Sequence, residues 1–146
     1  IEADGAGGAP LILHCVGHSM GGLVLRGALP AVFAGAPPGL RAGTFVTLSS
    51  PNLGIQASWG APQSLWRNLA KIGGLWSNQL PQLAVQDGGV DLPYLVALSE
   101  PRGRYVAALR RFRLRVCATM AASDPIVPTA SGAIWADRPW PRPELP

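Results

Sequence analysis

Residues that bind metals or cross-link chains are scarce in this sequence, which has two histidines and two cysteines among 146 residues. Cys15 and Cys117 are too few for a disulfide framework, and both stand in apolar runs, so we expect reduced, buried thiols. No Cys/His spacing is that of a zinc site. Nothing in the sequence therefore requires a metal or another cofactor.

Charged residues and long apolar runs are also scarce. Charged side chains make up 14% of the chain, against about 25% in an average soluble domain. No apolar run approaches the roughly 20 residues of a membrane span, and no signal-peptide pattern is visible at the start. With 48% hydrophobic residues, the composition indicates a well-buried globular piece without a transmembrane segment, cytoplasmic or peripheral to a membrane.

The positive charge is unevenly distributed. The net charge is +4, and 11 of the 12 basic residues are arginines. Six arginines lie between Arg102 and Arg115, which fits either a solvated helix face followed by a strand edge or a surface for an anionic partner such as a membrane. Aromatic residues do not interleave with them as in nucleic-acid-binding segments, so we expect no nucleic-acid partner.

Short apolar runs alternate with helix-like segments. The runs predict strands at residues 11–16, 44–50 and 113–120. Between them, residues 20–29 predict a buried helix ended by Pro30, and residues 105–112 an amphipathic helix. This order is typical of an α/β fold whose parallel strands are buried on both faces. The segments 34–39 and 121–134 are expected to be loops.

The remaining segments indicate one partial domain. Residues 55–100, with three tryptophans, several Gly and Pro and helical fragments near 63–72, predict an irregular insertion, either a lid or an ordinary packed segment. The tail 136–146 is too rich in proline for a helix or a central strand. We thus expect residues 1–146 to form a single domain with its core in 11–54 and 105–135.

Gly17-x-Ser19-x-Gly21 follows the first predicted strand directly and precedes the first helix. The spacing matches the nucleophile elbow, in which a serine occupies a tight, strained turn and glycines avoid a collision beside it. The turn would present the serine hydroxyl and place the N–H of Met20 at a helix N-terminus, where it can stabilise an oxyanion. The alternative is a glycine-rich turn with a capping serine.

Candidates for the other members of a catalytic triad are few. His18 adjoins Ser19, so its ring should point away from the hydroxyl, and it is expected to pack or hydrogen-bond beside the elbow. His14 lies in a strand and is expected to be a core histidine with a partner. Asp124 follows the third strand, where open α/β sheets place their sites, but it is equally explained as a turn residue before Pro125.

Several ordered blocks of the sequence resemble one family. They are VGHSMGGLVLRGAL, TFVTLSSPNLG, QLAVQDG, PYLVALSEP and AALRRFRLRVCATMAASDPIVPTASGAI, which together cover roughly residues 11–135. These blocks resemble the serine esterase family of α/β-hydrolases that includes fungal and plant lipase-like proteins. The resemblance implies a partial α/β-hydrolase fold, with Ser19 as nucleophile, Met20 as oxyanion donor, Gly17 and Gly21 as elbow glycines and Asp124 as triad acid. It implies hydrolysis of lipid esters such as acylglycerols.

The sequence departs from the family pattern in two places. Asn52 stands where the family usually has histidine, in Ser50-Pro51-Asn52-Leu53-Gly54. The triad base should follow Asp124, yet no histidine occurs after His18. We therefore expect a piece from the middle of a hydrolase domain with little turnover of its own. A non-catalytic hydrolase-like interaction module and an acyltransferase are the alternatives.

Overall fold

The computed structural model describes residues 10–55, 82–83, 92–120, 124 and 127–134. Its strands are β1 (Ile12–His18), β2 (Arg41–Leu48) and β3 (Leu114–Ala118). Its helices are α1 (Met20–Ala34), α4 (Tyr94–Ser99), α5 (Arg104–Arg110) and α6 (Thr129–Ala133). Much of the predicted insertion, including its tryptophans and residues 63–72, and the proline-rich tail lie outside the described residues.

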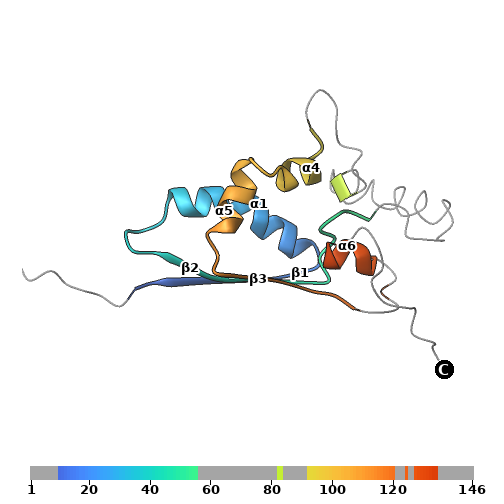
Figure 1. Cartoon of the computed structure of the whole chain (residues 1–146), viewed down its shortest axis with the longest axis horizontal. Helices are drawn as coiled ribbons and strands as arrows, with labels where there is room; N and C mark the ends of the chain where they lie inside the picture. Colours follow the sequence, from blue (N-terminus) through green and yellow to red (C-terminus); the bar gives the residue numbers. More distant parts are fainter. Residues whose placement is uncertain (1–9, 56–81, 84–91, 121–123, 125–126, 135–146) are drawn as a thin grey trace, which may run out of the picture.

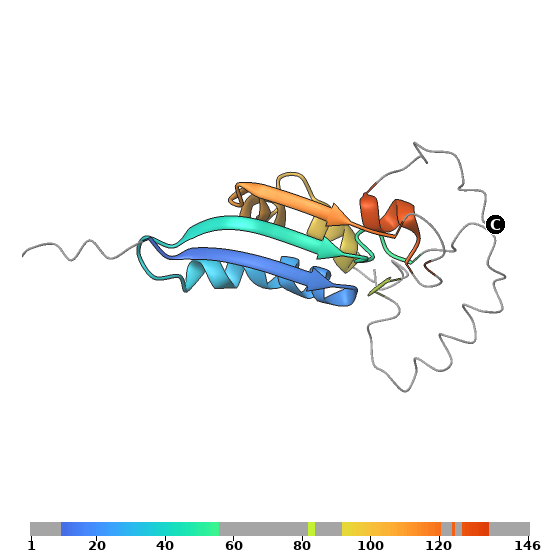
Figure 2. The same cartoon turned by 90° about the horizontal axis from the view of Figure 1, so that it is seen from below.

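The three strands form one parallel sheet in the order β1-β2-β3, which confirms the predicted α/β class. All three strands point toward the same end of the molecule, where α6 lies (Figure 2). The turns that follow the strands therefore share one edge of the sheet. This carboxyl edge is the region in which open α/β sheets bind their ligands.

Helices α1, α4 and α5 lie on one side of the sheet (Figure 1). The core between sheet and helices is aromatic: the Phe112 ring lies 5.4 Å from that of Phe45 and 5.8 Å from that of Phe33. Cys15 and Leu29 complete the buried part of this cluster with Ala108. Arg111 stacks on the outer side, with its guanidinium 3.9 Å from the Phe33 ring centre.

The other face of the sheet is exposed, so the prediction that the strands are buried on both faces is wrong. On β1 every second residue faces outward, and Val16 is 64% exposed. Both histidines are among these outward residues, so His14 is not a core residue. It does have a partner, because its Nδ1 accepts a hydrogen bond from the Thr44 N–H at 3.3 Å.

Helix α1 is longer than predicted, because it continues through Pro30 to Ala34. A proline inside a helix removes one backbone hydrogen bond and crowds the preceding turn. The turn beyond Pro30 contributes Phe33, whose ring packs on Phe112. Burial of this ring offsets the local cost of the proline.

Two further predictions are wrong. Residues Thr129–Ala133 form α6 in a segment expected to be a loop. Cys117 is exposed although it pairs with the buried Thr47, because β3 is at the edge of the described sheet, whereas Cys15 is buried as expected. Burial raises the pKa of the Cys15 thiol. The six arginines from Arg102 to Arg115 are all exposed, as a solvated face requires.

Helix α4 lies within the predicted insertion but belongs to a packed cluster. Its Leu95 and Leu98 are buried against Leu23 of α1. This end of the insertion is therefore part of the core on the helical side of the sheet. Among the described helices, none is long and apolar enough to cross a membrane.

Candidate active site

Ser19 stands alone between the last residue of β1 and the first residue of α1. Its backbone has φ 51° and ψ −130°, an uncommon conformation for a residue with a side chain. Two hydrogen bonds hold the turn: the Ser19 N–H donates to the Leu48 carbonyl at 2.8 Å, and the Gly22 N–H donates to the Ser19 carbonyl at 3.2 Å. Strain of this kind persists where the surroundings enforce it, and it is concentrated at functional sites.

The Ser19 side chain makes no capping hydrogen bond to the helix that follows it. A serine at this position usually accepts a bond from one of the first N–H groups of the helix. The alternative of a glycine-rich turn with a capping serine therefore has no support in the geometry of the turn. Met20 is the first residue of α1, so its N–H is one of those without a partner inside the helix.

The glycines beside the turn have different surroundings. A Cβ at Gly17 would lie 2.6 Å from both the Cα and the N of Gly22, so only glycine fits there. A Cβ at Gly21 would meet no atom within 4 Å. The close backbone approach expected beside the serine is therefore present, and its nearest atoms join Gly17 to Gly22. Gly22 also has no room for a side chain, because Ser50 lies against it.

Asp124 lies between β3 and α6, on the same edge of the sheet as Ser19. Its Oδ1 accepts a hydrogen bond from the Val127 N–H at 2.9 Å. This bond orients the carboxylate of Asp124 ahead of α6. Strand β2 separates the two strands that precede Ser19 and Asp124.

Asn52 connects the elements that follow the three strands. It is 2% exposed, and its Nδ2 donates to the Gly132 carbonyl in α6 at 3.0 Å. Its Oδ1 accepts from Arg26 of α1 at 3.5 Å. A second bond links the same loop to α6, because Ser131 Oγ lies 3.1 Å from the Leu53 N–H. The residue that departs from the family pattern is thus a buried bridge between the helix after Ser19 and the helix after Asp124.

Arg26 is a buried cation, 7% exposed, in an otherwise apolar helix. Besides Asn52, it donates to the Leu98 carbonyl at 3.0 Å, so both acceptors are neutral. Burial lowers the pKa of its guanidinium, while Cys117 and Tyr94 act in the opposite direction. The sequence contained a signal for this role, since Arg26 is the single charged residue of its helix, but its partners are distant in sequence.

Neither histidine is arranged beside the Ser19 side chain. His14 lies on β1 and is bonded to the Thr44 backbone. His18 directly precedes Ser19 and is exposed on the sheet face away from the helices. Among the described residues, no group of histidine, cysteine and carboxylate side chains is arranged to hold a metal ion.

A strand, a strained serine and a helix, with an aspartate at the same edge of a parallel sheet, make up part of an α/β fold. A family model described as "Putative serine esterase (DUF676)" matches residues 12–136. The chain belongs to this family, as its sequence blocks predicted. Comparisons with curated proteins and with solved structures found no match.

Proposed function

We propose that the chain carries the nucleophile of a serine-dependent carboxylic ester hydrolase that acts on lipid esters such as acylglycerols. The observation that carries the proposal is Ser19 itself, at φ 51° between β1 and α1 with no capping bond. A strained serine that does not serve its own helix has a hydroxyl available for chemistry. Membership of the serine esterase family supports the same role.

In the proposed reaction, Ser19 Oγ attacks the ester carbonyl while a histidine takes its proton. The Met20 N–H, at the N-terminus of α1, stabilises the oxyanion of the tetrahedral intermediate. The same histidine returns the proton to the departing alcohol. Water then attacks the acyl-serine by the reverse sequence, releasing the acid and restoring Ser19.

Asp124 is the proposed triad acid, which would hold the histidine in the required tautomer and orientation. Its Oδ1 is already directed by the Val127 N–H. The bridge through Asn52 supports this role, because it ties α6, which follows Asp124, to α1, which follows Ser19. The relative position of the two proposed residues therefore depends on buried contacts.

The base is the missing member of this triad. His14 is bonded to Thr44 on the exposed face of the sheet, and no histidine occurs after His18. Triad members act as a unit, so loss of one removes most of the rate enhancement. We therefore expect these 146 residues alone to hydrolyse esters very slowly unless an imidazole is supplied.

Chemical rescue tests the proposal. p-Nitrophenyl butyrate is incubated with the protein and increasing imidazole, and acyl-enzyme is located by mass spectrometry. We expect imidazole to raise nitrophenol release at least tenfold above the Ser19→Ala variant, with the butyryl group on Ser19. Ser49→Ala is the matched control, because Ser49 also has a positive φ, 44°, at the end of the neighbouring strand, and it should behave as wild type. Equal rates for wild type and Ser19→Ala would contradict the proposal.

A further inference from the structure

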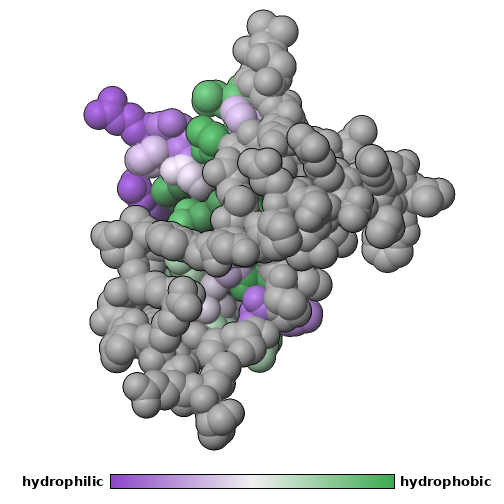
Figure 3. Space-filling view, turned by 90° about the vertical axis from the view of Figure 1, so that its right-hand side faces the viewer, coloured by the Kyte–Doolittle hydropathy of each residue, from purple (hydrophilic) through white to green (hydrophobic). Residues whose placement is uncertain are grey.

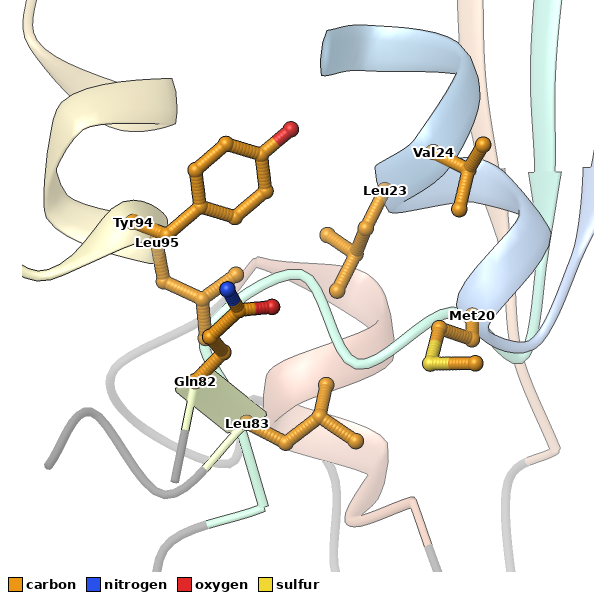
Figure 4. Close-up of a pocket in the computed structure, with 7 residues that line it drawn as sticks. All are labelled: Met20, Leu23, Val24, Gln82, Leu83, Tyr94 and Leu95. Carbon is orange, nitrogen blue, oxygen red and sulfur yellow. The ribbon is translucent and has the colours of Figure 1, made fainter. Parts of the chain in front are cut away.

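An apolar pocket of about 230 Å³ lies between α1 and α4 (Figure 4). Leu23 and Val24 of α1 form one side, and Tyr94 and Leu95 of α4 the other. The lining is completed by Met20, Gln82 and Leu83. Most of these side chains are hydrocarbon, so the pocket favours an apolar occupant.

Contacts with the rest of the fold hold several of the side chains and segments that line the pocket. Leu23 and Leu95 are each 4% exposed and belong to one buried cluster. Leu83 is held because its carbonyl accepts a hydrogen bond from the Ile55 N–H at 2.9 Å. Tyr94 is held edge-on against the ring of Tyr105, with 6.3 Å between ring centres. A pocket with such walls is formed before a ligand arrives, which lowers the entropy cost of binding.

Gly27 sets how closely Tyr94 approaches α1. A Cβ at this position would collide with the Tyr94 hydroxyl. Burial raises the pKa of this phenol, so it stays neutral near physiological pH. The α4 side of the pocket is therefore a neutral wall held close to the helix that begins after Ser19.

The pocket adjoins the reacting position because Met20 lines it. Met20 follows Ser19 directly, and its N–H is the proposed oxyanion donor. A carbonyl group held at Ser19 would thus have an apolar space beside it. Figure 3 views the molecule from this end, where apolar side chains of the described part, in green, reach the surface.

We propose that this pocket binds the acyl chain of the ester and limits it to about eight carbons; the inference rests on the proposed function. A buried apolar cavity of about 150 Å³ holds one benzene molecule, six carbons. In the same proportion, 230 Å³ holds an acyl group of about eight or nine carbons. The preferred substrates are therefore short- and medium-chain esters, and the long acyl chains of membrane lipids exceed the pocket.

The test measures binding without catalysis. The methyl-labelled protein is titrated with butyrate, hexanoate, octanoate, dodecanoate and hexadecanoate, and NMR shifts are followed at Leu23, Val24, Leu83 and Leu95. We expect affinity to rise up to about fourfold per added carbon as far as octanoate and then to level off. No shift at these methyls, or a gain that continues to hexadecanoate, would overturn the proposal.

Two substitutions on α1 provide the comparison. Val24→Trp, at an exposed position that lines the pocket, should weaken octanoate binding at least tenfold. Val32→Trp, also exposed on α1 but away from the pocket, should change it less than twofold. Equal effects of both would count against the pocket. This experiment measures binding and breaks no bond, so it is independent of the imidazole rescue. If octanoate binds but imidazole rescue fails, the proposed function is contradicted. If imidazole rescue succeeds but octanoate does not bind, only the pocket proposal is contradicted.

Discussion

Ser19 holds an uncommon backbone conformation at the end of β1, and its neighbours show what enforces it. The Leu48 carbonyl accepts its N–H from the adjacent strand, and the chain on either side comes into contact through Gly17 and Gly22. Positive φ costs a non-glycine residue of order 1 kcal/mol or more. The Ser19 side chain makes no capping hydrogen bond that would compensate for this cost.

The two glycines of the Gly-x-Ser-x-Gly spacing should respond differently to alanine. Gly17→Ala places a methyl group against the Gly22 backbone, so we expect unfolding free energy to fall by about 1–3 kcal/mol. Gly21→Ala meets open space inside a helix, and we expect a gain of about 0.5–1 kcal/mol. Urea unfolding monitored by circular dichroism measures both. Equal losses would contradict the contact geometry at the turn.

Helix α1 is the element that joins the site, the pocket and the core. Its first residue follows Ser19, its first two turns line the pocket, and Arg26 reaches the loop after β2. Its last turn carries Phe33 onto the aromatic core. These contacts extend along the whole length of the helix, past the proline in its interior.

Pro30 therefore destabilises α1 locally, and the packing of the following turn on the core keeps the helix intact. In Pro30→Ala, a backbone N–H becomes available to the Arg26 carbonyl and the crowding by the ring is removed, so we expect unfolding free energy to rise by about 1–3 kcal/mol. Pro37→Ala, in the loop before β2, is the control and should give no gain. Thermal unfolding distinguishes them. A lower midpoint for Pro30→Ala would mean that the ring itself contributes to the fold.

The elements were predictable where a local pattern determines them. Apolar runs located all three strands, and the glycine spacing located the turn at Ser19. Helix α1 was predicted to end at Pro30, because the gain from Phe33 comes from Phe112, 79 positions away in sequence. The bridge through Asn52 could not be foreseen for the same reason, since its partners Arg26 and Gly132 are distant in the chain.

At the scale of the whole molecule, the described helices on the sheet all lie on one side. The opposite face of the sheet carries exposed apolar side chains: Val16 on β1 is 64% exposed, and Leu114 on β3 is 53% exposed. Parallel sheets are ordinarily covered on both faces. Periodicity of a single strand could not reveal this difference, because a continuous apolar run looks the same whether one face is covered or both.

The exposed sheet face should bind apolar dyes. Val16→Thr with Leu114→Thr keeps residues suited to strands and should reduce anilinonaphthalene sulfonate fluorescence by at least half. Val32→Thr with Leu53→Thr makes the same chemical change at residues 42% and 45% exposed outside the strands and should have a smaller effect. Indistinguishable fluorescence from the two variants would contradict an exposed apolar sheet face.

The most direct test of the account is covalent labelling of Ser19. A fluorophosphonate with a short alkyl chain is incubated with the protein in imidazole buffer, and the modified residue is identified by peptide mass spectrometry. The account predicts one adduct on Ser19, none in Ser19→Ala, and unchanged labelling in Ser49→Ala. Labelling that persists in Ser19→Ala, or no adduct on Ser19 while a known serine esterase reacts in the same tube, would contradict the assignment of Ser19 as the nucleophile.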